Sequence, residues 1–381
     1  MRQIVCACGL LLTFLHTPAL ADGAARVVRI GALLPISGAG AYFGVQDREG
    51  IDLALDQLAK SPPGGARFDV HIEDSACSPL PATQAARRLL DGYRPDIIIG
   101  EECSDATLAV MPLVLQAGVP LLNAGSSALR ITDPGNRETF RILPDEVMQG
   151  EDLANHAYRD LGARNAVLLH ENTNAGIGNA AIFARRFAAL GGKVVQTIGF
   201  GRDVNDFTAI ATRIAALGPI DVIPTYTLEG QGLKITEALA QAGVVRGGGG
   251  HAVQLGTIWL PLGFDQQAGK AAEGYVRIVQ FEPRDPRPVV QDFVAAFQAK
   301  FGHQPTHISA HAYDQIMLIA DAVRRGAATP AAIRDRLAAT RGFSGVTGSV
   351  VFDEHNQNVS RDTIHYVETE ADGSFKPLDW K

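Results

Sequence analysis

Short apolar runs alternate along this chain with longer segments in which apolar side chains recur every three or four positions. The runs are typical of strands buried in a parallel sheet, and the longer segments are typical of amphipathic helices. A first series predicts strands at Val27–Pro35, Phe68–Glu73, Ile97–Ile99 and Val119–Leu122, with helices at Gly44–Lys60, at Leu80–Leu90 and from Ala106 onward.

A second series runs from a helix at Glu151–Leu161 to a strand at Ala252–Thr257, and a Pro-rich linker follows at Pro283–Pro288. Two βα series joined by short connections indicate an α/β fold of two doubly wound, Rossmann-like lobes. We expect the ligand cleft between them. The remaining chain predicts helices at Val289–Phe301, Ser309–Arg324 and Pro330–Ala339, then strands at Val350–Phe352 and Thr363–Val367.

The stretch from Ile97 to Val110 carries the clearest functional signal. A buried strand ends there and a helix follows, with Ser104 at the expected N-cap position. Backbone N–H groups and the positive end of the helix dipole meet at such a turn and favour an anion. A second turn, which we also interpret as strand–turn–helix, carries Gly125, Ser126 and Ser127. Two such turns predict a small-ligand site at the edge of the sheet.

Residues 1–21 have the composition of a secretory signal peptide. Arg2 precedes an apolar run at Ile4–Leu15, which is too short for a membrane span, and the small residues Ala19-Leu20-Ala21 form a cleavage site. We therefore expect export to the periplasm, with the mature chain starting at Asp22.

The mature chain keeps two cysteines, Cys77 and Cys103. In an oxidising compartment an isolated pair is most simply one disulfide, and two free buried thiols are the alternative.

Charge and motifs exclude several function classes. A net charge of −7 argues against nucleic acid or anionic lipid as a partner. The sequence has no Gly-Lys-Ser/Thr phosphate loop, no Gly-x-Ser-x-Gly elbow and no His-Glu-x-x-His motif. We expect a binding protein rather than an enzyme, with no cofactor and no metal.

Seven segments in order resemble the extracytoplasmic solute-binding proteins of ABC importers, specifically the branched-chain amino-acid and amide-binding (type I periplasmic binding protein) family. They are IGALLPISGAGAYFG, EDSACSP with GEECSDATLAV, GVPLLNAGSSALRIT, FRILPDEVMQG, DFTAI, AYDQIMLIADAV and GVTGSVVFDE. The resemblance covers nearly the whole mature chain. It implies two α/β lobes joined by three crossing segments, with lobe 1 at 22–145 plus 283–350 and lobe 2 at 146–282 plus 351–381.

The resemblance also implies site residues. The family's bridging cysteines fall on Cys77 and Cys103, and the serine that binds the ligand carboxylate falls on Ser104. The segment that contacts the ligand's amino-acid head falls on Gly125, Ser126 and Ser127. The aromatic residue that lines the pocket in the first lobe falls on Phe43, with Tyr42 beside it.

The second lobe departs from the family pattern. The segment from Gln254 to Trp259 has no carboxylate where amino-acid binders place one against the ligand ammonium. Glu229 and Glu102 are candidate replacements, whereas Trp259 and Tyr226 are candidates to stack on an aromatic ring instead.

We therefore expect a monomeric periplasmic protein that binds a small carboxylate-bearing solute, either an amino acid of the branched-chain type or an aromatic or organic acid. The resemblance implies delivery to an ABC permease and its ATPase in the inner membrane. A periplasmic sensor of the same fold, which signals and does not import, is the alternative.

Overall fold

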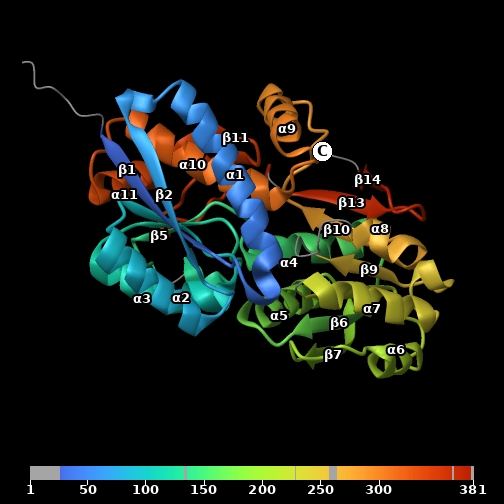
Figure 1. The fold of residues 1–381 in the computed structure, drawn as a ribbon. Coiled ribbons are helices and arrows are strands. Elements are labelled where there is room, and N and C mark those ends of the chain that lie inside the picture. Colours follow the sequence, from blue (N-terminus) through green and yellow to red (C-terminus); the bar gives the residue numbers. More distant parts are fainter. Residues whose placement is uncertain (1–25, 133–134, 228, 257–263, 363, 379–381) are drawn as a thin grey trace, which may run out of the picture.

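The computed structural model describes residues 26–132, 135–227, 229–256, 264–362 and 364–378 (Figure 1). The signal peptide expected at 1–21 lies outside these ranges. Within them, no helix combines the length and the hydrophobicity needed to cross a membrane.

The first lobe is built on a parallel five-stranded sheet with the order β2-β1-β3-β4-β5. Its β3 strand is buried on both sides: Ile97 and Ile99 belong to the core beneath α1 and α10, and Ile98 belongs to the core beneath α2 and α3. This burial explains the uninterrupted apolar run. The strands are β1 (Val27–Leu34), β2 (Arg67–Asp74), β3 (Ile97–Gly100), β4 (Leu121–Asn123) and β5 (Thr139–Arg141), and the helices named here are α1 (Ala41–Lys60), α2 (Pro79–Arg87), α3 (Ser104–Ala117) and α10 (His307–Arg324).

Segments far along the chain complete this lobe. Figure 1 shows the orange helix α10 beside the blue strands of the N-terminal sheet, with which it shares a core. Phe281 and Phe352 also belong to the first-lobe core, where Phe352 packs edge-on against Phe140. We propose that the lobes divide close to residues 145, 281 and 352. The added elements are α9 (Pro288–Phe301), α10, α11 (Pro330–Ala338), β11 (Arg341–Gly345) and β12 (Gly348–Val351).

The second lobe is built on a seven-stranded sheet with the order β14-β13-β10-β9-β8-β6-β7. Strands β7 to β10 are mutually parallel with β6, whereas β13 and β14 form an antiparallel edge. The strands are β6 (Asn165–Glu171), β7 (Lys193–Phe200), β8 (Val222–Tyr226), β9 (Val253–Gly256), β10 (Val276–Val279), β13 (His365–Thr369) and β14 (Phe375–Leu378), and the helices are α4 (Glu146–Asn155), α5 (Asn174–Ala189), α6 (Thr208–Ala215), α7 (Glu229–Gln241) and α8 (Phe264–Ala268).

The chain passes between the lobes three times, after β5, after β10 and after β12. The first and third crossings are joined by Arg141, which is fully buried and donates from Nε to Gln357 Oε1 at 2.5 Å. Gln357 donates in turn to the carbonyl of Leu143, and Asn358 donates to the carbonyl of Ile142. The predicted α/β class with two lobes and three crossing segments is confirmed.

One local prediction was wrong. The turn after β4 leads only into a 3₁₀ turn at Leu129–Ile131 and then into β5, so it is not a second strand–turn–helix unit. The pattern of apolar residues also did not predict β5, in which Phe140 pairs with Leu122 of β4. A strand of three residues is too short to give a periodic signal.

Candidate functional site

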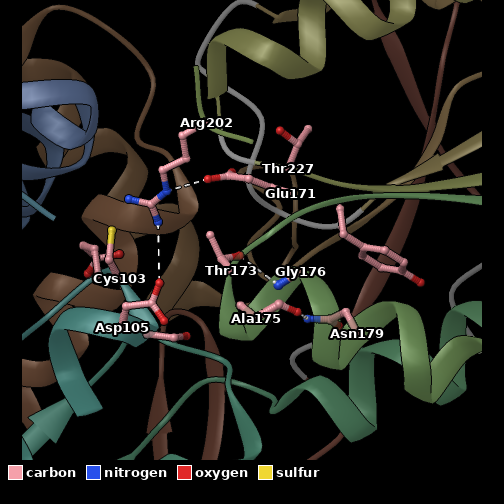
Figure 2. Close-up of a pocket in the computed structure, with 12 residues that line it drawn as sticks. Cys103, Asp105, Glu171, Thr173, Ala175, Gly176, Asn179, Arg202 and Thr227 are labelled. Atoms are coloured by element: carbon pink, nitrogen blue, oxygen red, sulfur yellow. Dashed lines mark hydrogen bonds and ion pairs between the residues drawn. The ribbon is translucent and has the colours of Figure 1, made fainter. Parts of the chain in front are cut away.

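A pocket lies between the lobes where α3 of the first lobe faces the carboxyl ends of β6 and β8 in the second (Figure 2). It encloses about 460 Å³ of space between protein atoms, part of which is open to solvent. The lining residues are Glu102, Cys103, Ser104, Asp105, Glu171, Thr173, Ala175, Gly176, Asn179, Arg202, Tyr226 and Thr227.

The first turn of α3 presents Ser104 to the pocket. Cys103 is the N-cap and Ser104 is the first helical residue, so α3 begins one residue earlier than predicted. Ser104 is buried, and its Oγ accepts a hydrogen bond from the N–H of Ala128 at 3.3 Å. The N–H groups of a first helical turn have no acceptor within the helix, so they are available to a ligand.

The predicted disulfide is confirmed. Cys77 and Cys103 are bonded, with their Cα atoms 5.3 Å apart. The bond ties the loop after β2 to the residue that caps α3.

A second helix start faces the pocket from the other lobe. Thr173 caps α5 by accepting the N–H of Gly176 at 3.1 Å, and Asn179 donates to the carbonyl of Ala175 at 2.9 Å (Figure 2). The pocket therefore lies at the positive ends of two helix dipoles, one from each lobe.

Charged side chains from both lobes face each other across the pocket. Arg202, which follows β7, donates to Glu171 at 2.5 Å and lies 3.9 Å from Asp105 of the first lobe (Figure 2). Asn174 also donates to Asp105. No motif in the sequence pointed to these residues, although Glu171 and Arg202 stand at strand ends, where a doubly wound sheet places its ligands.

The two serines of the second turn have different environments. Ser126 donates to the carbonyl of Glu101 at 2.8 Å and lies 2.7 Å from the hydroxyl of Thr107. Ser127 is fully buried, and its hydroxyl has no hydrogen-bond partner among the described residues. Gly125 is buried beside Glu102.

The aromatic candidates lie near the contact between the lobes. Phe43 is buried in one core cluster with Tyr226 and Ile308, and Tyr42 packs against this cluster. Tyr226 also lines the pocket, and its hydroxyl is buried without a partner in the described part of the chain. Burial raises the pKa of Tyr226 well above its usual value, so the phenol is neutral.

Two candidates of the second lobe have no described side chain. Glu229 is the first residue of α7, and only its backbone is described. Trp259 lies outside the described residues.

A buried acidic cluster borders the pocket. Burial raises the pKa of Glu101 to about 7 and, together with the charge of Glu101, raises the pKa of Glu102 to about 8. Burial and both glutamates also raise the pKa of Asp47, on α1, well above its usual value. Glu101 accepts hydrogen bonds from the hydroxyl of Ser75 at 2.6 Å and from the N–H of Cys103 at 2.8 Å.

Known proteins share this architecture. The family model described as "Periplasmic binding protein" matches residues 27–373. The chain is 27% identical over 341 residues, 87% of each protein, to the leucine-, isoleucine-, valine-, threonine- and alanine-binding protein of Pseudomonas aeruginosa. It is 30% identical to an amino acid binding protein of the same organism over 205 residues, and this match spans about half, 54%, of each chain.

The solved structure of the branched-chain amino acid transporter substrate binding protein LivJ from Streptococcus pneumoniae, in complex with isoleucine, superposes with a TM-score of 0.83. It is 25% identical, and the match covers 93% of this chain and 99% of that one. Since the family model spans nearly all of the described chain, and the fold and the pocket between the lobes agree with it, this chain belongs to the periplasmic binding protein family.

Proposed function

We propose that this protein is the periplasmic solute receptor of an ABC importer and that it captures a small carboxylate-bearing solute between its lobes. It acts as a monomer without chemistry of its own, and its closed, loaded form delivers the solute to a membrane permease with its ATPase. The solute is an amino acid or an aromatic or organic acid, and the names of two relatives favour amino acids with small or branched side chains.

The observation that carries this proposal is the position of Ser104. Its hydroxyl and the free N–H groups of the first turn of α3 face the pocket, at the positive end of a 14-residue helix. The start of α5 faces the same space from the second lobe. Two helix N-termini that converge on one pocket stabilise a carboxylate, and the solute carboxylate would join the two lobes.

Closure would exclude water from the bound solute. Phe43 and Ile308 of the first lobe already share a buried cluster with Tyr226 and Ile278 of the second. These apolar contacts form only when the lobes approach each other, so ligand binding and lobe closure are coupled. A closed shape that depends on the solute is the feature that a permease can recognise.

The proposal is tested with the mature chain from Asp22, stripped of ligand by unfolding and refolding. Thermal unfolding is recorded with amino acids, aromatic acids, dicarboxylates and amides, and titration calorimetry follows each hit. A solute at about 100 times its dissociation constant adds roughly 2.7 kcal/mol of stability. Stabilisation by at least one carboxylate, lost in Ser104→Ala, is expected. Stabilisation by uncharged amides alone would contradict the proposal.

A further inference from the structure

We infer that Glu102 forms a cation subsite in the first lobe, so that the solute carries an ammonium group which this lobe binds. The inference rests on the proposed function and narrows its solute class from carboxylates to amino acids and related zwitterions. It also places the negative charge that pairs with the ligand ammonium in the turn between β3 and α3. The segment of the second lobe where amino-acid binders carry this carboxylate has none.

The position of the Glu102 carboxylate depends on a glycine. Glu102 is 6% exposed and lines the pocket. Its Oε2 lies so close to Gly125 that a Cβ placed on this glycine would be 2.2 Å away. Any larger residue at position 125 would displace the carboxylate. The absence of a side chain at Gly125 therefore leaves space for the Glu102 carboxylate beside the turn that carries Ser126 and Ser127.

No group in the described part of the chain neutralises Glu102. Its carboxylate accepts no hydrogen bond there, whereas Glu101 next to it accepts two. Asp47 is close enough to interact electrostatically with both glutamates, and its buried Oδ2 also has no partner among the described residues. A buried, unpaired carboxylate costs several kcal/mol, and a bound cation would remove this cost.

Protein cations do not fill this role. Arg202 carries the one basic side chain among the described lining residues. Its guanidinium is bonded to Glu171 and faces Asp105. The described lining residues therefore supply no cation to Glu102, which a bound proton neutralises in the ligand-free protein and which a cationic ligand can neutralise instead.

A neutral group independent of the acidic cluster also points to a polar ligand here. Tyr226 is 2% exposed and lines the pocket, and its hydroxyl has no partner in the described residues. An amino-acid head offers this hydroxyl both donors and acceptors, because it carries an ammonium and a carboxylate on one carbon atom.

The subsite is tested with matched ligands. For each amino acid that binds, calorimetry compares it with the same skeleton without the amine and the same skeleton without the carboxylate. For leucine these are 4-methylpentanoate and 3-methylbutylamine. The variants are Glu102→Gln, which keeps the shape of the neutral side chain, and Glu73→Gln as the control. Glu73 lies in the same lobe and pairs with Arg88 at 2.7 Å, outside the pocket. Circular dichroism checks that both variants fold.

We expect Glu102→Gln to weaken amino-acid binding roughly 30-fold or more, since it leaves a buried ammonium unpaired, and Glu73→Gln to change it less than about 2-fold. Acids without the amine should bind weakly to the wild type and equally well to both variants. Equal affinity for leucine and 4-methylpentanoate, unchanged in Glu102→Gln, would overturn the subsite and leave the proposed function intact. If 3-methylbutylamine were the only one of the three ligands to bind, and Glu102→Gln abolished its binding, the subsite would be supported. The proposed requirement for a carboxylate in the solute would then be contradicted. No binding by any ligand would overturn both.

Discussion

Asp105 of the first lobe lies 3.9 Å from the guanidinium of Arg202 in the second lobe, across the pocket. Asn174 donates to the same carboxylate. These contacts exist only while the lobes are closed, so they favour the closed form over the open one. Arg202 is half exposed, with 48% of its side chain accessible, so the ion pair contributes at most about 1 kcal/mol.

Asp105→Ala should therefore weaken solute binding by about 2- to 5-fold, mainly through faster dissociation, because closure loses both contacts. Stopped-flow dissociation measures this change, and Glu73→Gln is again the control. An unchanged dissociation rate would mean that Asp105 does not hold the lobes together.

Gln357 links the first and third crossings through its bond to Arg141. Gln357→Ala leaves this buried guanidinium without one acceptor and should lower the free energy of unfolding by about 1.5–3 kcal/mol. Urea denaturation measures the loss. Gln116→Ala, on the exposed side of α3, should change stability by less than about 0.5 kcal/mol. Similar losses in the two variants would argue against a structural role of the Arg141–Gln357 bond.

Substitutions of Ser126 and of Ser127, the two serines of the second turn, should affect different properties of the protein. Ser104→Ala combined with Ser127→Ala should abolish solute binding and leave the fold intact, because Ser104 lines the pocket and the Ser127 hydroxyl has no partner among the described residues. Ser126→Ala should mainly lower stability, since its hydroxyl is bonded to Glu101 and Thr107. Calorimetry and thermal unfolding separate these effects. Unchanged affinity in the double variant would refute this placement of the site.

The ligand-free protein should become less stable as the pH rises from 6.5 to 8.5. Burial raises the pKa of Glu101, Glu102 and Glu146 to about 7, 8 and 7, from an ordinary value of 4.5. The folded chain then binds more protons than the unfolded chain. Their stabilising contribution is complete below about pH 4.5 and is lost as the pH rises through the raised pKa values, by about 1.4 kcal/mol per pH unit for each proton.

Three of the described histidines shift in the opposite direction but act in a different pH window. Burial lowers the pKa of His307 to about 3 and the pKa of His311 and of His365 to about 4, so their contribution is present above pH 6.5 and is lost at lower pH. Urea denaturation at pH 6.5, 7.5 and 8.5 therefore reports on the carboxyl groups. Glu102→Gln should show a shallower decline than the wild type, and an identical decline would mean that Glu102 is ionised throughout this range.

Removal of the disulfide should destabilise both the lobe and the site. Cys77 and Cys103 are 26 residues apart, and the chain-entropy model gives about 3.5 kcal/mol for a loop of this length. Cys77→Ser with Cys103→Ser should lower the unfolding midpoint and also weaken solute binding, because Cys103 caps α3 beside Ser104. Weaker solute binding without a lower unfolding midpoint would contradict the expected contribution of the disulfide to stability.

The amino-acid sequence determined the two-lobe architecture, because strands buried on both faces, such as Ile97–Ile99, require an uninterrupted apolar run. It also indicated the disulfide and the serine at the start of α3, since these depend on residue type and on local strand-to-helix order. The boundary of α3 shifted by one residue, which local patterns rarely resolve.

Only the tertiary structure decided which side chains face the ligand. Ser126 and Ser127 are adjacent in the chain, yet the Ser126 hydroxyl is bonded to Glu101 and Thr107 around the start of α3, and the Ser127 hydroxyl has no partner among the described residues. Arg202 comes to lie near Asp105 only through the approach of the two lobes. Side-chain direction in a turn and contact between distant segments depend on packing, and no periodic pattern along the chain encodes them.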